Sequence, residues 1–391
     1  MKKVLLIKGI SQYDAMRIYI DEYAKGLKAE NVDSVIVDTK KDSFVEDCMK
    51  ILATGEIDWV FTCNGILLDN DFFNNVLNYY QVKKCTFIYD HPIYQFNRLF
   101  KADRNTVVFC CDQRHVNFME KYYKNINIGK VGFLPLSGSY LENSYPYEER
   151  KIDLLFTGTF VDMNRTFEEL KNLPEVYYKI ALKLIEIMIV EPSLTIEDAL
   201  NLVLDDYQFE RTDEEFHDIL ITVRQADQYV REYFRENLVR TIIENDILLN
   251  VHGYGWESFP SKKKDNIIIR NGYGKEALKS LLQTKISLNI MPWFRGGFQE
   301  RIASAMLSGA VSLTDTSDYI EDNFVNGKNI VIYSLKKMYQ LPEIISNLLD
   351  NPDKASMIAR NGYTEAVNKH TWHHRMKDVL NVLQEFESQN N

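Results

Sequence analysis

The sequence has no long hydrophobic run. Its strongest apolar stretch, residues 180–190 (IALKLIEIMIV), is interrupted by Lys183 and Glu186, whereas a membrane-spanning helix needs about 20 predominantly apolar residues. The N-terminal MKKVLLIKGI contains an apolar run of only four residues, VLLI, which is too short for the hydrophobic region of a secretory signal. We therefore expect no integral membrane segment and a cytoplasmic protein.

Cysteine and histidine are both rare, with five and seven residues respectively. The five cysteines are odd in number, lack C-x-x-C spacing and lie within the first 111 residues: Cys48, Cys63, Cys85, Cys110 and Cys111. This pattern indicates reduced core residues and no disulfide framework. His370, His373 and His374 cluster in HTWHH, but no cysteine or carboxylate pattern accompanies them, so packing at a helix start is the favoured interpretation. We expect no metal site and no cofactor.

Basic residues are outnumbered by acidic ones, 46 to 56, which gives a net charge of −10. Nonspecific binding to nucleic acid or anionic lipid requires a basic surface, so we expect no nucleic-acid partner. A nucleotide ligand needs only a local cationic pocket and is compatible with this charge. With 391 residues, of which 45% are hydrophobic and 26% charged, the chain is long enough for two soluble domains.

The N-terminal part alternates short β-rich runs with helical stretches. Strands are predicted at residues 4–7, 34–37, 59–62, 86–89 and 107–110, and helices around 14–28, 43–53, 70–82 and 113–123. Such alternation is typical of a doubly wound parallel sheet. Residues 131–150 contain Pro, Gly and Ser and are predicted to be a connector between domains.

The C-terminal part repeats the α/β pattern with an interruption. Strands are predicted at 151–156, 247–251, 267–269, 286–290, 310–314 and 330–333, and helices at 274–283, 341–349, 353–366 and 372–387. A mostly helical insert at about 163–245 separates the first two strands; it could shape an acceptor site, form an oligomer contact or buttress the fold. Asp205 and Asp206 fall in this insert and are predicted to be solvated.

Residues 285–315 (KISLNIMPWFRGGFQERIASAMLSGAVSLTD) are the most informative part of the chain. A strand leads through Gly296 and Gly297 into a helix at 299–308, and Gly309 follows as a helix C′ residue. A helix N-terminus behind two glycines favours a phosphate. Arg295 and Arg301 flank this end, where a cation alone is unfavourable. The two arginines could bind a diphosphate. Alternatively, they could point into water or form ion pairs with Asp or Glu.

This block resembles the C-terminal half of the glycosyl transferases group 1 family, in particular the branch similar to spore-maturation protein B. The motif residues are Leu288-Asn289, Gly296-Gly297, Glu300-Arg301, residues 305–311 (AMLSGAV) and Asp315. Phe156-Thr157-Gly158, Gly253-Tyr254-Gly255-Trp256, Tyr319-Ile320 and residues 324–330 match the same branch. The resemblance covers about residues 150–375 well. It implies the GT-B fold, with two Rossmann-like doubly wound domains facing a cleft, and sugar transfer from a nucleotide donor.

The resemblance also implies a domain division. Residues 1–140 would form an acceptor-side domain, and residues 141–371 a nucleotide-sugar domain that carries the insert. Residues 372–391 would form a helix that crosses back to the N-terminal domain. Whether the protein forms oligomers stays open.

The candidate site residues follow from the same resemblance. Donor or nucleotide contacts are assigned to Gly158, Tyr254, Gly255, Arg295, Gly296, Gly297, Phe298, Arg301, Ser304 and Asp315, and catalytic roles to His91 and Glu300. Two family glutamates that contact the donor sugar and the ribose are replaced here by Gly296 and Ser304. Glu300, one helical turn before Ser304, could cover one of these roles or only favour the helix N-terminus.

Several of these residues have structural alternatives. Asp90 could cap the next helix, with His91 merely on a loop before Pro92. Asp315 could bind a donor hydroxyl or start a helix. Tyr254 could stack on the base or bond the donor, and His252 could line the cleft.

The predicted function is a metal-independent glycosyltransferase that uses a nucleoside-diphosphate sugar, with a UDP-sugar favoured. The acceptor would be a protein, a glycan or a lipid-linked molecule, and the family analogy favours retention of configuration. The alternatives are a non-catalytic GT-B subunit that binds a sugar nucleotide or a partner, which the displaced glutamates motivate, and a sugar-nucleotide epimerase.

Overall fold

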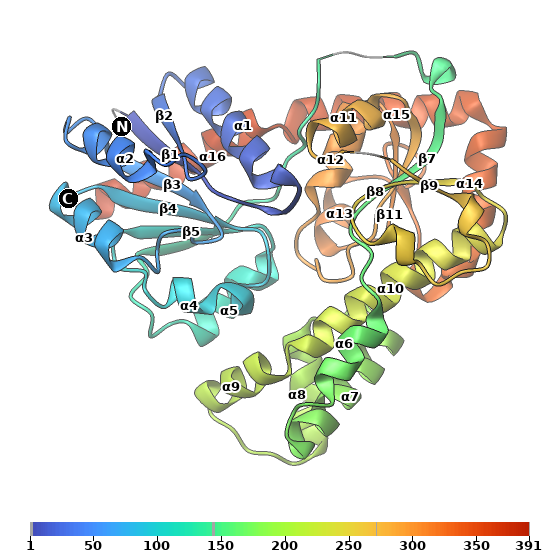
Figure 1. The fold of residues 1–391 in the computed structure, drawn as a ribbon, viewed down its shortest axis with the longest axis horizontal. Coiled ribbons are helices and arrows are strands. Elements are labelled where there is room, and N and C mark those ends of the chain that lie inside the picture. Colours follow the sequence, from blue (N-terminus) through green and yellow to red (C-terminus); the bar gives the residue numbers. More distant parts are fainter. Residues whose placement is uncertain (1–2, 143–144, 271, 391) are drawn as a thin grey trace. The chain divides into compact units, whose positions relative to one another are not determined.

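The chain forms two compact units in the computed structural model, which describes residues 3–142, 145–270 and 272–390. Unit 1 consists of Met1–Ser139 together with Lys369–Asn391, and unit 2 of Tyr140–Asn368. Each unit contains its own six-stranded sheet, and every paired strand in both sheets is parallel. Helices flank each sheet (Figure 1), so the predicted α/β class is confirmed.

Unit 1 has the strand order β2-β1-β3-β4-β5-β6. Its strands are β1 (Lys3–Lys8), β2 (Asp33–Asp38), β3 (Trp59–Cys63), β4 (Lys83–Ile88), β5 (Thr106–Cys110) and β6 (Lys130–Phe133). Leu5, Ile7 and Val60 from the sheet pack with Leu52 of α2 (Phe44–Leu52) and Leu77 of α3 (Asp71–Tyr79) in a buried core. Buried β-branched and aromatic runs on adjacent strands therefore produce the predicted sheet.

Strand β6 corrects the sequence prediction, which placed its residues at the boundary and start of a connector. Val131 pairs with Val108, and Gly132 with Phe109, at the edge of the sheet. All four residues of the strand are only half-buried. A short edge strand with a central glycine has a weak β signal, which is why the prediction was wrong here.

The helices of unit 1 include the last helix of the chain. They are α1 (Ala15–Ala29), α2 (Phe44–Leu52), α3 (Asp71–Tyr79), α4 (Phe96–Leu99), α5 (Gln113–Tyr122) and α16 (Trp372–Asn390). The ring of Trp372 in α16 lies 4.9 Å from that of Tyr19 and 5.2 Å from that of Tyr23, both in α1. The side chain of Trp59 donates to Glu387 at 2.8 Å. Aromatic packing and this partly buried hydrogen bond hold α16 against the rest of unit 1.

The cysteines lie in the core, and the clustered histidines contact other residues of the protein. All five cysteines are buried and free, as predicted. His370 accepts from Arg375 at 3.1 Å, while His374 contacts the Thr371 hydroxyl at 2.7 Å and His373 contacts Glu30 at 2.7 Å. The three imidazoles thus have three different partners at the start of α16, as the packing interpretation expects.

Unit 2 has the strand order β12-β11-β10-β7-β8-β9. Its strands are β7 (Ile152–Thr157), β8 (Leu249–His252), β9 (Ile267–Ile269), β10 (Thr284–Leu288), β11 (Val311–Thr314) and β12 (Val331–Ile332). Helices α11 (Lys275–Leu282), α12 (Glu300–Leu307), α13 (Asp318–Asn323), α14 (Leu341–Asp350) and α15 (Pro352–Lys369) accompany them. Leu155 of the sheet packs with Leu281 of α11 and Ala305 of α12 in a buried cluster.

The predicted helical insert interrupts unit 2 after β7. It contains α6 (Met163–Leu170), α7 (Glu175–Val190), α8 (Ile196–Asp206), α9 (Asp213–Val223) and α10 (Gln225–Glu244), and it extends from the sheet as a group of its own in Figure 1. Helix α10 packs on α6 and α7 and also reaches β8 and α14. Asp205 and Asp206 are exposed at the end of α8, as predicted. The last helix of the insert is therefore its main link to the rest of unit 2.

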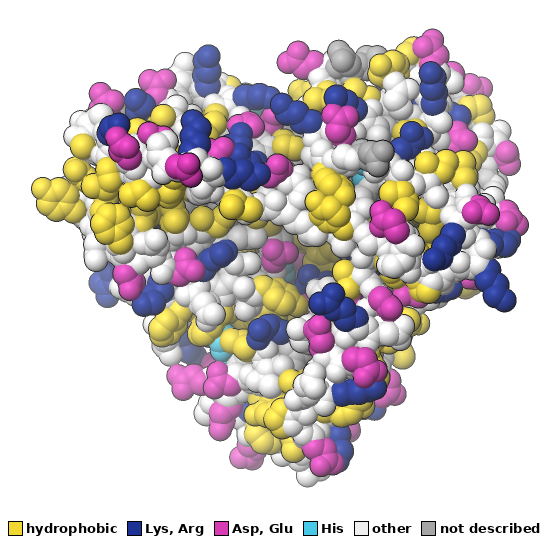
Figure 2. Space-filling view, viewed as in Figure 1, with side chains coloured by type: hydrophobic (Ala, Val, Ile, Leu, Met, Phe, Trp, Pro, Cys, Tyr) yellow, Lys and Arg dark blue, Asp and Glu magenta, His cyan; other side chains and the backbone are white. Residues whose placement is uncertain are grey.

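The surface mixes charges of both signs. On the face shown in Figure 2, Lys and Arg side chains are interspersed with Asp and Glu. Among the described residues, no helix combines the length and the apolar character that crossing a membrane requires.

Candidate functional site

Most of the predicted donor residues lie where the strands of the second sheet end. Ligands of open α/β sheets bind at this carboxyl edge. The ends of β7 and β8 are joined closely there, because the N–H of Gly158 donates to the carbonyl of His252 at 2.8 Å. Gly253 has φ +146°, and a Cβ at this position would lie 2.0 Å from the carbonyl oxygen of Gly158. Glycine is therefore required where the two strand ends meet.

The turn after β8 leaves one aromatic side chain accessible. Gly255 has φ +86°, and a Cβ there would approach the carbonyl oxygen of Phe160 to 2.3 Å. Tyr254 is 48% exposed, and its ring centroid lies 4.4 Å from that of Tyr273. An exposed tyrosine in this position suits stacking with a flat ligand.

His252 has a structural role. Its Nδ1 contacts the carbonyl of Gly272 at 2.9 Å, and its Nε2 contacts the hydroxyl of Ser280 at 2.8 Å. The side chain is buried, and burial lowers its pKa. Since both ring nitrogens have protein partners, His252 connects β8 to the segment around α11 and is not offered to a ligand.

Asp315 holds the loop that follows β10. Its Oδ1 accepts the backbone N–H of Met291 at 2.8 Å, and the side chain is almost completely buried. Within residues 3–142, 145–270 and 272–390, its Oδ2 has no hydrogen-bond partner. Burial raises the pKa of Asp315 to about 6, although the nearby Arg295 opposes the shift. Ser317, and not Asp315, caps the following helix α13, because its hydroxyl accepts the N–H of Ile320.

The raised pKa of Asp315 predicts a pH-dependent stability. The native carboxyl binds a proton between its ordinary pKa of about 3.8 and its folded pKa of about 6, and the unfolded chain does not. Stability from this group is thus present below about pH 4 and is lost as the pH rises through 6. Asp315→Asn keeps the acceptor for Met291 but cannot ionise. Its free energy of unfolding, relative to the wild type, should rise by up to about 3 kcal/mol between pH 4 and pH 7, measured by urea denaturation at both pH values. A constant difference would contradict this assignment.

The start of α12 brings two more predicted residues together. Gln299 is the N-cap and makes no side-chain capping bond. Its side-chain oxygen instead accepts from the guanidinium of Arg301, which also donates to the carbonyl of Thr157 at the end of β7. One turn along the same face, the hydroxyl of Ser304 donates to Glu300. The arginine therefore stands at the positive end of α12, beside the end of β7, as a phosphate site requires.

The glycine loop before α12 is tied to its surroundings. The carbonyl of Gly297 accepts from Ser317 at 2.5 Å, and Arg295 donates to the carbonyl of Pro292. The side chain of Phe298 is fully buried, and its ring stacks on Tyr319 at 5.0 Å. Phe298 can therefore meet a ligand only through its backbone, and its side chain belongs to the core.

His91 lies in unit 1, at the end of β4. It is the N-cap of the short 3-10 helix Pro92–Gln95, because its Nδ1 accepts the N–H of Ile93 at 3.2 Å. In the neutral imidazole this places the ring proton on Nε2. Asp90 accepts from Asn64 at 3.2 Å. Because His91 is the N-cap, the alternative in which Asp90 caps this helix is wrong. The His91 ring packs on His115 and Phe118, with centroids 4.8 and 4.7 Å away.

Two residues that were not among the predicted site residues contact the turn after β7. Trp256 donates to the carbonyl of Gly158 at 2.8 Å, and Arg235 of α10 donates to that of Thr159 at 2.8 Å. Arg235 and its helical neighbour Arg231 also lie over the ring of Trp293 in the loop after β10. Arg235 and Thr159 are 76 residues apart in the sequence, and no local sequence pattern predicts a contact between them.

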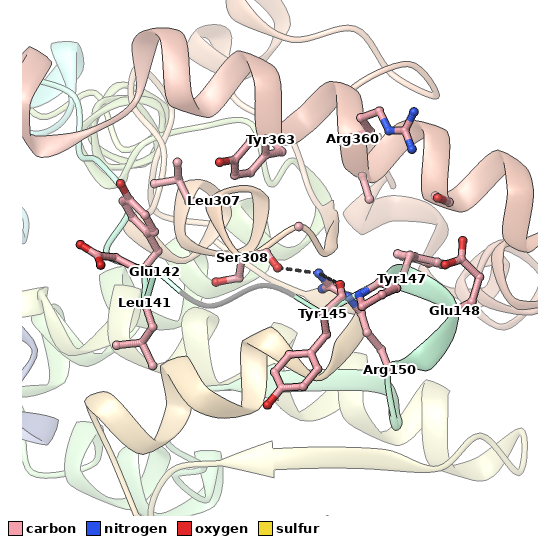
Figure 3. Close-up of a pocket in the computed structure, with 15 residues that line it drawn as sticks. Leu141, Glu142, Tyr145, Tyr147, Glu148, Arg150, Leu307, Ser308, Arg360 and Tyr363 are labelled. Atoms are coloured by element: carbon pink, nitrogen blue, oxygen red, sulfur yellow. Dashed lines mark hydrogen bonds between the residues drawn. The ribbon is translucent and has the colours of Figure 1, made fainter.

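A cavity of about 500 Å³ opens at the opposite edge of the second sheet, where the strands begin (Figure 3). Its lining includes Tyr145, Arg150 and Tyr363, and none of the predicted site residues is among its described lining residues. The guanidinium of Arg150 donates to the carbonyls of Thr284 and Ser308 at 2.7 and 2.8 Å. These bonds fix the starts of β10 and β11, so the arginine is a structural residue of that edge.

The predicted absence of a metal site stays a prediction. Across the described residues, no group of three or more His, Cys, Asp or Glu side chains is arranged to hold a metal ion.

Comparisons with known proteins find one family and several solved structures that this chain is similar to. Residues 228–381 match the family described as "Glycosyl transferase-like", and no curated protein matches the sequence. Among solved structures, Anabaena Alr3699/HepE in complex with UDP-glucose has a TM-score of 0.53 at 8% identity, covering 98% of this chain and 100% of that one. Sucrose-phosphate synthase from Thermosynechococcus elongatus has 0.54 at 11%, covering 100% of both.

A third similar structure is an alpha-glucosyltransferase in complex with UDP and a 13-mer DNA, with a TM-score of 0.60 at 9% identity, covering 98% of this chain and 99% of that one. At these identities the structures establish the fold. The chain therefore has the fold of these GT-B proteins, and residues 228–381 of it are similar to the glycosyl transferase-like family. The narrower resemblance to the spore-maturation protein B branch stays a prediction.

Proposed function

We propose that this protein transfers a sugar from a nucleoside-diphosphate sugar, preferably a UDP-sugar, to a protein, glycan or lipid-linked acceptor. The observation that carries the proposal is the start of α12, where Arg301 lies beside the end of β7 inside the segment that matches the family. Two of the similar structures hold UDP-glucose and UDP, which supports uracil as the base. The DNA in one of them belongs to that protein, and we keep the expectation of no nucleic-acid partner here.

The proposed chemistry is electrostatic. The bond between the anomeric carbon and the diphosphate oxygen breaks, an acceptor oxygen bonds to that carbon, and the acceptor proton passes to the departing diphosphate. The departing diphosphate gains negative charge, which helix N–H groups and fixed cations stabilise. Arg301, Arg295 and the backbone of Gly296 and Gly297 would supply this stabilisation without a metal ion.

The remaining residues have proposed roles of recognition. Tyr254 would stack on the base, and Gly158 and Gly255 would let the donor approach the backbone. Glu300, held by the Ser304 hydroxyl, would accept hydrogen bonds from the sugar or the ribose. The imidazole of His91 would hydrogen-bond the donor sugar or the acceptor. Unit 1 would be the acceptor-side domain and unit 2 the nucleotide-sugar domain, with retention of configuration.

Calorimetric titration of the purified protein with UDP, GDP, ADP, TDP and CMP, without added metal, tests this proposal. Micromolar binding of UDP, and weaker binding of the others, is the expected result. Binding accompanied by no donor hydrolysis or transfer would favour the non-catalytic subunit. Interconversion of one sugar nucleotide into its epimer would favour the epimerase. No binding to any of the five would overturn the donor site.

A further inference from the structure

The turn that follows β7 is fixed by side chains from three different elements. The carbonyl of Thr157 accepts from Arg301 of α12, and that of Gly158 accepts from Trp256 in the 3-10 helix Trp256–Ser258. The next carbonyl, that of Thr159, accepts from Arg235 of α10. The carbonyls of three successive residues thus each accept a hydrogen bond from a side chain. The conformation of the turn depends on all three donors.

Arg235 belongs to the helical insert, whose role the sequence leaves open. It is one helical turn from Arg231, so both side chains lie on one face of α10. Their guanidinium carbons lie 5.7 and 4.9 Å from the ring centroid of Trp293. Such distances are typical of cation–π contacts, which a planar guanidinium makes well. The insert therefore contacts both the turn after β7 and the loop that leads into α12.

The two arginines differ in their other contacts. Arg231 forms an ion pair with the buried Asp227 at 2.5 Å, one turn earlier on the same face. This pair orients Arg231 against Trp293. Arg235 instead spans from the Trp293 ring to the Thr159 carbonyl. It is thus the residue through which α10 connects the two segments that carry candidate donor contacts.

We propose that Arg235 is a positioning residue of the donor site and that the insert is part of this site. The inference rests on the proposed function, because it concerns the same diphosphate. Arg235 fixes Thr159 and the Trp293 loop, and thereby keeps Arg301 and the glycine loop at the spacing that a diphosphate needs. Errors of about 1 Å in such positions are costly to ligand recognition and turnover.

The test compares variants of the full chain by calorimetric titration with UDP. Arg235→Ala should raise the Kd for UDP about 10-fold. Arg235→Lys should recover part of the affinity, because lysine can still donate to Thr159 but cannot stack as a plane. Trp293→Ala should weaken UDP binding similarly. The double variant Arg235→Ala/Trp293→Ala should lose less binding free energy than the sum of the losses in the two single variants. Arg240→Ala is the matched control, since Arg240 lies on the same helix but bonds to Glu236, Glu244 and Pro260.

The outcomes separate the inference from the proposed function. A purely structural role would lower the urea midpoint of Arg235→Ala and leave its Kd for UDP equal to that of Arg240→Ala, which would overturn the inference alone. If Arg235→Ala does not fold, Arg235→Lys and Trp293→Phe supply the same comparison. A wild-type protein that binds none of the five nucleotides would overturn the proposed function, and the inference with it.

Discussion

Arg301→Ala should lower kcat/KM for the sugar donor roughly 10²- to 10³-fold, equivalent to about 3–4 kcal/mol of transition-state stabilisation. The guanidinium stands at the N-terminus of α12 and donates to both Gln299 and the carbonyl of Thr157. It is therefore held in place before the donor binds, and a fixed cation stabilises charge on a leaving group without reorganising. Release of nucleoside diphosphate from the donor, measured over a range of donor concentrations, gives kcat and KM separately.

Two controls make this prediction specific. Arg301→Lys keeps the charge but loses the planar fork, and it should fall between the alanine variant and the wild type. Arg360→Ala removes an exposed arginine that lines the cavity at the opposite edge of the sheet, and it should behave as the wild type. If Arg301→Ala turned over the donor as fast as the wild type, the cation would not touch the leaving group. Loss of activity only in Arg360→Ala would move the site to that cavity.

Gly253→Ala should destabilise the protein by about 3–4 kcal/mol. The residue has φ +146°, and its new Cβ would lie 2.0 Å from the carbonyl oxygen of Gly158. The atoms that the new Cβ would clash with belong to the backbone of Gly158, which cannot move away as the tip of a flexible side chain could. Either the ends of β7 and β8 separate or the peptide rotates, and both would also disturb the turn that Arg301 holds. Urea denaturation measures the loss of stability.

Gly327→Ala is the matched control for this substitution. Gly327 also has a positive φ, +73°, but a Cβ there meets nothing within 4 Å. Only the conformational cost should remain, about 1 kcal/mol. Equal effects at the two glycines would show that the close approach at Gly253 does not govern stability.

The sequence predicted the site elements well where the signal is local. The block at 285–315 folds as expected: Thr284–Leu288 is a strand, Glu300–Leu307 a helix and Val311–Thr314 a strand, with Gly309 at φ +70°. A buried strand, a helix that begins after two glycines and a helix that ends at a glycine can each be recognised from a few consecutive residues. The edge strand Lys130–Phe133 was missed because its residues are half-buried and include a glycine.

Contacts between distant segments were beyond prediction. Nothing near Arg235 indicates that it reaches Thr159, and nothing near Trp293 indicates that two arginines of the insert lie against it. The burial that raises the pKa of Asp315 depends likewise on how the loop after β10 folds over β11. Such features arise from tertiary packing. Residue patterns indicate the class of fold, but they do not show which distant residues come into contact.

A crystal structure of the protein with UDP bound would locate the nucleotide and decide whether the proposed donor site exists. We expect the diphosphate at the N-terminus of α12, within hydrogen-bond distance of Arg301 and of the backbone at Gly296 and Gly297. The base should lie near Tyr254. A nucleotide bound instead in the cavity beside Tyr145 and Tyr363, or a diphosphate that makes no contact with residues 295–301, would contradict it.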